Sequence, residues 1–110
     1  MSLTKKDKNR DNGIDADFSI LEKIKIQKPS QYQVILLNDD YTPMDFVVDI
    51  LCHIFHKSHE EAVQIMMNVH EKGRGVCGIY NYEIAETKCN LVLRNAQKEG
   101  YPLQCKIEKI

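Results

Sequence analysis

The segment from residue 32 to residue 45 constrains the fold more than any other part of the chain. Residues 32–37 form a nearly continuous apolar run rich in strand-forming residues, and the polar residues 38–40 end it. Such a run predicts a buried strand followed by a turn. Thr42 then precedes Pro43, which is typical of a helix N-cap followed by a proline at the first helical position. A helix is therefore expected directly after the strand.

Helix signals follow one another along the middle of the chain. Apolar residues at helical spacing predict a first helix from about 43 to about 56. Ser58 and Glu61 have the spacing of a capping box, which predicts the start of a second helix that Gly73 can end. These signals predict two helices in tandem, without a strand between them.

The rest of the chain adds two strands and a third helix. Residues 75–80 read as a strand, Asn81 is suited to cap a helix, and Gly100 can stop it. Residues 103–108 alternate between apolar and polar, which is the pattern of a strand with one wet face. The order βααβαβ predicts an α+β fold, a small three-stranded antiparallel sheet covered on one face by three helices.

Length and charge limit the organisation of the chain. A chain of 110 residues with 43% hydrophobic residues is expected to form one compact domain. Residues 1–30 carry seven basic and five acidic residues with little apolar content, which predicts a flexible N-terminal extension before a domain at residues 31–110. The formal charge of −1 predicts no nucleic-acid partner, and no apolar run approaches a membrane span. Without an apolar leader, a cytoplasmic location is expected.

Candidate chemical groups are few, and each has an ordinary structural explanation. Adjacent Asp39 and Asp40 favour turn chemistry over acid–base catalysis, because neighbours in a turn point apart. His53, His56 and His59 lie three residues apart, but the predicted helix break at 58 argues against a metal site. The four cysteines form no Cys-x-x-Cys pair, and no catalytic triad order or phosphate loop occurs. The sequence therefore predicts neither an enzyme nor a cofactor.

A group of methionines leaves two interpretations open. Met44 and Val47 share one face of the first predicted helix, while Met66, Val69 and His70 share one face of the second. Methionines at such positions usually fill a core, although they also line adaptable binding grooves. A histidine on such a face is usually a half-buried residue with satisfied hydrogen bonds.

Four blocks of the sequence resemble the ClpS family of adaptors of the bacterial Clp protease. They are residues 34–47, 66–70, 73–78 and 85–88, and the resemblance extends over about residues 31–110. It implies a protein without catalytic activity that recognises N-degrons, which are proteins that begin with Leu, Phe, Tyr or Trp. It also implies delivery of these proteins to the N-terminal domain of a ClpA-like AAA+ unfoldase, and it implies the βααβαβ order.

The resemblance also assigns roles to individual residues. A free α-amino group is a cation with three donors, so a site that reads it needs acceptors. The resemblance implies that Asn38, Asp39 and His70 hold the amine and first peptide groups. It places Asp40 and Thr42 at the mouth of the site. It implies a pocket for the first side chain built from Met44, Val47, Met66, Val69 and Leu103, with Met44 as a gate that rejects side chains branched at Cβ. Contact with the unfoldase is implied for Glu83 and Lys88 with Tyr41 nearby, although spacing alone makes the first two an ordinary solvated helix face.

Two alternatives stand beside the adaptor interpretation. A related module of eukaryotic ubiquitin ligases shares the pocket, but this chain carries no RING or zinc cluster to accompany it. A structural domain like that of the ribosomal stalk has a similar small α+β outline. Such a domain has no need for Asn38, Asp39 and His70 together.

Overall fold

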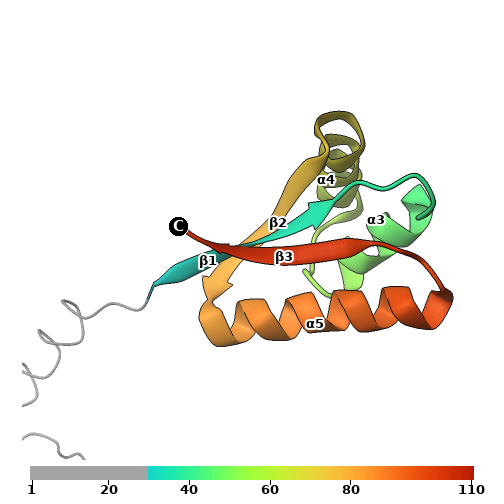
Figure 1. Cartoon of the computed structure of the whole chain (residues 1–110). Coiled ribbons are helices and arrows are strands. Elements are labelled where there is room, and N and C mark those ends of the chain that lie inside the picture. The colour runs from blue at the N-terminus through green and yellow to red at the C-terminus, as the bar shows by residue number, and fades with distance from the viewer. Residues whose placement is uncertain (1–29) are drawn as a thin grey trace, which may run out of the picture.

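The computed structural model describes residues 30–110, so the predicted flexible extension, except for Ser30, lies outside the described residues. The elements are β1 (Gln31–Leu37), α3 (Met44–His53), α4 (His59–Lys72), β2 (Arg74–Asn81), α5 (Tyr82–Glu99) and β3 (Gln104–Lys109). Their order is the predicted βααβαβ (Figure 1).

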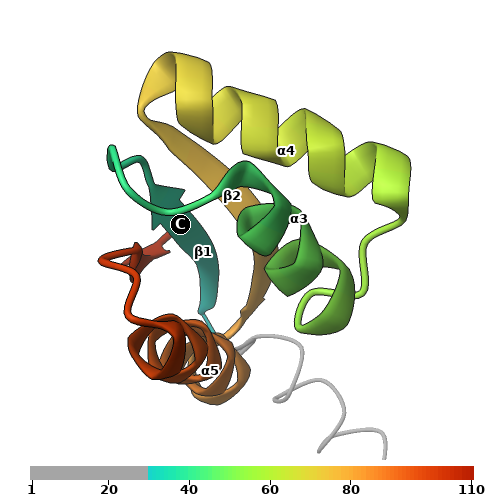
Figure 2. The ribbon, with the colours of Figure 1, turned by 90° about the vertical axis from the view of Figure 1, so that its right-hand side faces the viewer.

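The three strands form one antiparallel sheet in the order β2-β1-β3. The helices lie on one side of this sheet, with α5 running along it and α4 beside β2 (Figure 2). The predicted α+β fold with three helices on one face of the sheet is therefore confirmed. The first strand of the sequence becomes the centre of the sheet, which explains its continuous apolar run.

Burial of β1 on both faces explains that run residue by residue. Val34 and Leu36 belong to the core between sheet and helices, and both are fully buried. Ile35 points to the opposite face because side chains alternate along a strand, yet it is also 0% exposed. On that face Arg74 of β2 bonds Glu108 of β3 at 3.1 Å, and the register places this ion pair diagonally across Ile35. Long charged side chains thus cover a face that no helix covers.

Local capping signals set most helix ends where they were predicted. Ser58 and Glu61 form both hydrogen bonds of a capping box at the start of α4. The Asn81 side chain accepts a 3.0 Å hydrogen bond from the backbone N–H of Ile84 at the start of α5. Gly73 and Gly100 end α4 and α5 at φ 85° and 80°, a left-handed conformation that costs glycine little.

The first helix is shorter than predicted, since α3 ends at His53 rather than at about residue 56. His56 adopts φ 55°, and the backbone N–H of Lys57 bonds back to the carbonyl of Leu51 at 3.1 Å. This turn places Phe55 in the core, where it is 4% exposed. The apolar period therefore continues past the helix end because Phe55 is buried by the turn.

Three further features concern membrane spans, metal sites and cysteines. None of the helices in residues 30–110 is both long and apolar enough to cross a membrane. Within the same residues no three His, Cys, Asp or Glu side chains converge as a metal site would require. All four cysteines are free, and burial raises the pKa of the Cys77 thiol to about 12, so this thiol stays protonated at neutral pH.

Candidate functional site

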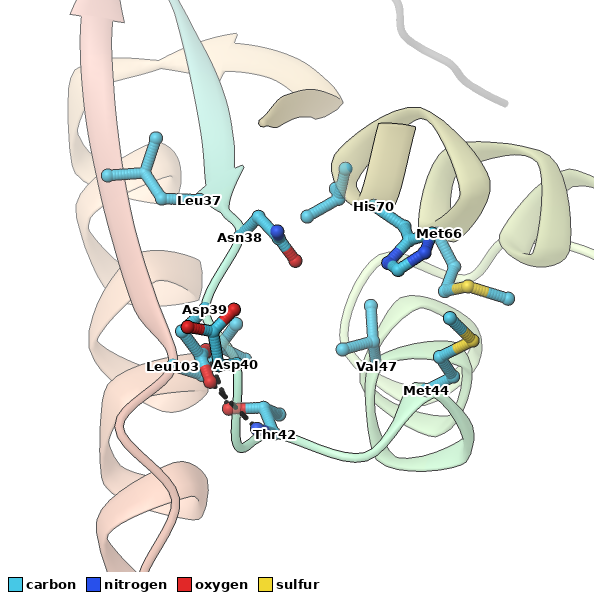
Figure 3. Close-up of a pocket in the computed structure, with 11 residues that line it drawn as sticks. Leu37, Asn38, Asp39, Asp40, Thr42, Met44, Val47, Met66, His70 and Leu103 are labelled. Carbon is cyan, nitrogen blue, oxygen red and sulfur yellow. Dashed lines mark hydrogen bonds between the residues drawn. The ribbon is translucent and has the colours of Figure 1, made fainter. Parts of the chain in front are cut away.

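A cavity of about 230 Å³ opens where β1 ends and the chain passes into α3. The loop from β1 forms one wall, and α3, α4 and the residue before β3 form the others (Figure 3). Its lining consists of Leu37, Asn38, Asp39, Asp40, Thr42, Met44, Val47, Met66, Val69, His70 and Leu103. These residues come from four separate parts of the sequence.

All ten residues that the family resemblance assigned to peptide binding line this one cavity. Leu37 lines it as well and was not predicted as a site residue. In Figure 3 the Leu37 side chain points away from Asn38 and His70, so it lies at the margin. Its position as the last residue of the apolar run is the only sequence signal that pointed to it.

Asp39 organises the polar wall of the cavity. Its Oδ1 accepts hydrogen bonds from the backbone N–H groups of Tyr41 at 2.8 Å and Thr42 at 2.7 Å. Its Oδ2 accepts a 2.7 Å bond from the Thr42 hydroxyl. The predicted turn chemistry is thus confirmed for Asp39. A carboxylate oxygen can accept two bonds, so Oδ2, which accepts one here, keeps acceptor capacity for a ligand.

These bonds also set the charge state of Asp39. Partial burial by itself raises the pKa of the carboxyl, but the hydrogen bonds from Thr42 and Tyr41 outweigh it and hold the pKa below its ordinary value. Asp39 is therefore ionised at neutral pH. A fixed negative charge at the wall of a cavity favours a cationic ligand group.

The role predicted for Thr42 as a helix N-cap is wrong. The residue at the N-cap of α3 is Pro43, and no side chain bonds the first turn in the manner of a cap. The Thr42 hydroxyl instead donates a hydrogen bond to Oδ2 of Asp39. A Thr hydroxyl can accept a hydrogen bond from a backbone N–H of the helix that follows it, or donate one to a nearby carboxylate. Here the bond to the charged acceptor is the stronger of the two.

Asn38 and His70 face the cavity from opposite walls. The backbone N–H of Asn38 donates to the carbonyl of Gly73 at 3.0 Å, which ties the loop to the end of α4. Figure 3 shows the Asn38 side chain directed toward the side that carries His70. Within residues 30–110 neither side chain has a hydrogen-bond partner, and His70 is exposed rather than half-buried as expected. Both groups are therefore available to a ligand.

The opposite side of the cavity is apolar. Val47, Met66, Val69 and Leu103 are each 9% exposed or less and belong to the core. Met44 differs because it is 45% exposed and lies outside that core. The interpretation of the methionines as core filler therefore holds for Met66, whereas Met44 stands at the rim of the cavity (Figure 3).

Gly75 contributes to the cavity without lining it, a role that was not predicted from the sequence. A Cβ added there would lie 2.7 Å from Cγ2 of Val69 and 3.2 Å from the backbone oxygen of Ile65. Only glycine lets α4 approach β2 this closely. The approach sets the position of Val69, and so the apolar wall. A glycine within a predicted strand was the available signal.

The residues predicted for unfoldase contact do not form one patch. Tyr41, 79% exposed, follows the end of β1. Glu83 is exposed in the first turn of α5, the helix that begins directly after Asn81. Asn81 pairs with Gln31, the first residue of β1, so Glu83 lies near the start of that strand. The length of the strand separates Tyr41 from Glu83, so the expectation that Tyr41 lies near Glu83 is wrong.

Lys88 is partly buried and bonded to another element rather than free on a solvated helix face. Its Nζ donates a 2.6 Å hydrogen bond to the backbone oxygen of Ile54. It also lies 5.7 Å from the ring centre of Phe55 and 5.2 Å from that of Tyr80. These distances are within the range of cation–π attraction. Lys88 therefore ties α5 to the turn after α3.

Comparisons with known proteins identify related sequences over most of the chain. Residues 27–106 match the family described as ATP-dependent Clp protease adaptor protein ClpS. A ClpS adapter of Hyphomonas neptunium is 54% identical over 99 residues, which is 90% of this chain and 84% of that protein. One from Rhodospirillum centenum is 50% identical over 103 residues, or 94% and 95% of the two chains.

A solved structure is also similar. It is described as the structure of Agrobacterium tumefaciens ClpS2 bound to L-phenylalaninamide. The TM-score is 0.74 with 36% sequence identity, and the match covers 76% of this chain and all of that one.

Proposed function

The chain belongs to the ClpS family of adaptors of the ATP-dependent Clp protease, and from that premise we propose that it binds N-degrons in the cavity at the end of β1. Its family makes it an adaptor and not an enzyme. The ligands are proteins that begin with Leu, Phe, Tyr or Trp. The observation that carries the proposal is that one cavity has an acceptor-rich wall and an apolar wall.

The polar wall binds the free α-amino group of the ligand. Asp39 supplies a carboxylate, Asn38 an amide oxygen and His70 an imidazole nitrogen, and an ammonium group has three donors to match them. Hydrogen bonds to a charged group each contribute about 1.5 to 3 kcal/mol. An acetylated N-terminus has no positive charge and only one donor, so it leaves part of this wall without partners. Asp40 and Thr42 lie at the mouth and bind the next peptide groups.

The apolar wall takes the first side chain. The cavity of about 230 Å³ is smaller than the roughly 300 to 1,000 Å³ of sites for drug-sized ligands, and this suits a single side chain. Burying a Leu or Phe side chain contributes about 1.5 to 3 kcal/mol. Together with the amine contacts this is compatible with micromolar binding, near −8 kcal/mol. The Agrobacterium relative was solved with L-phenylalaninamide, which carries both a free amine and a benzyl group.

Delivery needs a second surface, which we place around Glu83. The partner is the N-terminal domain of the AAA+ unfoldase of the Clp protease. Glu83 is exposed and stands beside exposed Tyr82 and Ile84, which are 46% and 45% accessible. Exposed aromatic and aliphatic side chains with a charge at their edge fit the apolar core and polar rim of a protein interface. Lys88 supports this surface from within, and Tyr41 lies apart from it.

The deciding experiment compares a peptide that begins with Phe with its acetylated form by calorimetry. The free peptide is expected to bind at least about a hundredfold more tightly, a difference of about 2.7 kcal/mol. The Asp39→Ala variant should lose most of the affinity for the free peptide, whereas Asp49→Ala, on another face of α3, should keep it. Equal affinity for both peptides would contradict the proposal. Unchanged affinity of Asp39→Ala for the free peptide would remove the proposed role of this carboxylate.

A further inference from the structure

Helix α4 joins strand β2 with almost no connection between them. Gly73 alone separates Lys72, the last residue of α4, from Arg74, the first residue of β2. The carbonyl oxygen of Gly73 accepts the 3.0 Å hydrogen bond from the backbone N–H of Asn38. The end of α4 is therefore held beside the sheet in two ways, by the short covalent connection and by the loop after β1 (Figure 2). This leaves α4 little freedom to move away from β2.

The side chain of Val69 lies between strand β2 and the cavity. Val69 lines the cavity, and on the side of β2 it faces Gly75, where an added Cβ would lie 2.7 Å from Cγ2 of Val69. Carbon atoms that are not bonded to each other pack at about 3.5 to 4.0 Å. Any side chain at position 75 must therefore displace Val69.

The cavity is the space into which Val69 can move. Val69 is 4% exposed and belongs to the core, and the interior of a protein is closely packed. The helix itself cannot easily retreat, because its end is held at Gly73. A methyl group at position 75 would therefore push the Val69 side chain toward the open cavity and narrow the cavity there.

On the premise that this cavity binds N-degrons, we propose that Gly75 sets the size of the first side chain that the cavity accepts. Gly75 does not line the cavity, so it is a positioning residue that acts through Val69. The hydrogen at position 75 lets Val69 rest against β2, which leaves room in the cavity for an aromatic ring. Narrowing the cavity takes this room from the largest side chains first. The binding of Phe, Tyr and Trp termini therefore depends on glycine at this position.

The test uses two peptides that differ only in the first residue, which is Trp in one and Leu in the other. Relative to the wild type, G75A should lose at least about tenfold more affinity for the Trp peptide than for the Leu peptide, since one methylene in an apolar pocket changes affinity by about 10- to 200-fold. The variant V69A/G75A should show the ratio of affinities of V69A, because the side chain that would be displaced is gone. Calorimetry measures both peptides.

The variant G78A is the matched control. It adds the same methyl group to the same strand, but there the added Cβ meets the far end of the Tyr80 side chain. Neither Gly78 nor Tyr80 lines the cavity. G78A should therefore keep the wild-type ratio of affinities for the two peptides.

Urea unfolding without peptide tests the contact itself. G75A should lower the free energy of unfolding less in V69A than in the wild type, because the contact between the added Cβ and Cγ2 of Val69 is then absent. If G75A does not fold, V69A/G75A should still fold. Failure of both variants to fold, or an equal loss of stability in both backgrounds, would overturn the proposal, because the strain would then lie against the backbone oxygen of Ile65, 3.2 Å from the added Cβ.

The peptide measurements can overturn the proposal as well. A wild-type ratio of affinities in folded G75A would show that the size limit does not depend on Gly75. A ratio that shifts in favour of the Trp peptide would show that α4 moves away and widens the cavity. Neither result alters the preference of the wild type for a free over an acetylated N-terminus, so this proposal and the proposed function fail separately.

Discussion

The hydroxyl of Thr42 donates a 2.7 Å hydrogen bond to Oδ2 of Asp39, across the loop that forms the polar wall of the cavity. The same Thr42 offers its backbone N–H to Oδ1. Two bonds from one residue hold the carboxylate in a single orientation. Thr42 therefore sets the position of the carboxylate that we propose as an acceptor for the α-amino group.

Replacing Thr42 with Val should raise the pKa of Asp39. The hydroxyl bond favours the ionised carboxylate, so its loss leaves burial and two backbone bonds as the remaining influences. Carbon-detected NMR of the Asp39 carboxyl during an acid titration measures the pKa directly. Thr42→Ser keeps the hydroxyl and should keep the lowered value. An unchanged pKa in Thr42→Val would show that the backbone N–H groups alone suffice.

Asp39 should also make the stability of the fold depend on acid pH. Its pKa is lowered in the folded protein, so the ionised group stabilises the fold above the unfolded pKa of about 3.9. This stabilisation is lost as the pH falls through the folded value. Urea unfolding of the wild type and Asp39→Asn should therefore show a gap in free energy at pH 7 that shrinks toward pH 2. A gap that stays constant over this range would contradict the assignment.

If Met44 is the gate of the cavity, the Met44→Ala variant should bind side chains branched at Cβ more tightly. Met44 is 45% exposed at the rim, so its removal widens the entrance without opening a hole in the core. Affinity for a peptide that begins with Ile is expected to rise about tenfold relative to one that begins with Leu, which corresponds to about 1.4 kcal/mol. Fluorescence titration measures both. Met66→Leu, a change in the buried wall, should leave this ratio the same.

Lys88→Met should destabilise the fold itself. It removes the bond to the Ile54 carbonyl and the contact with two aromatic rings. Such a charged hydrogen bond contributes about 1.5 to 3 kcal/mol, and partial solvent access lowers the expected loss to about 1 to 2 kcal/mol. Urea denaturation measures it, with Lys98→Met, at an exposed position of the same helix, as the control.

Glu83→Ala separates partner contact from stability. It should weaken binding to the unfoldase N-terminal domain with little change in the free energy of unfolding. If Lys88→Met weakened that binding at wild-type stability, Lys88 would be a direct contact rather than a support for the turn after α3.

Predictions from the sequence succeeded where the deciding interactions are local. The capping box of Ser58 and Glu61 and the left-handed ends at Gly73 and Gly100 depend on residues within a few positions of one another. The apolar alternation of β3 and the continuous run of β1 report burial that each strand needs. These features together determined the βααβαβ order. The resemblance to ClpS identified ten side chains, and the fold then brought them around one cavity.

Where groups compete for one partner, or lie far apart in sequence, only the tertiary structure decided. The Thr42 hydroxyl had two possible hydrogen-bond partners, the backbone of α3 and the carboxylate of Asp39. It bonds the carboxylate, and the first turn of α3 has no side-chain cap. The pairing of Gln31 with Asn81 placed Glu83 at one end of β1 and Tyr41 beyond the other. The Nζ of Lys88 donates a hydrogen bond to the carbonyl of Ile54, 34 positions away in the sequence. Periodicity records which face of an element is buried, but it carries no information about which distant group that face meets.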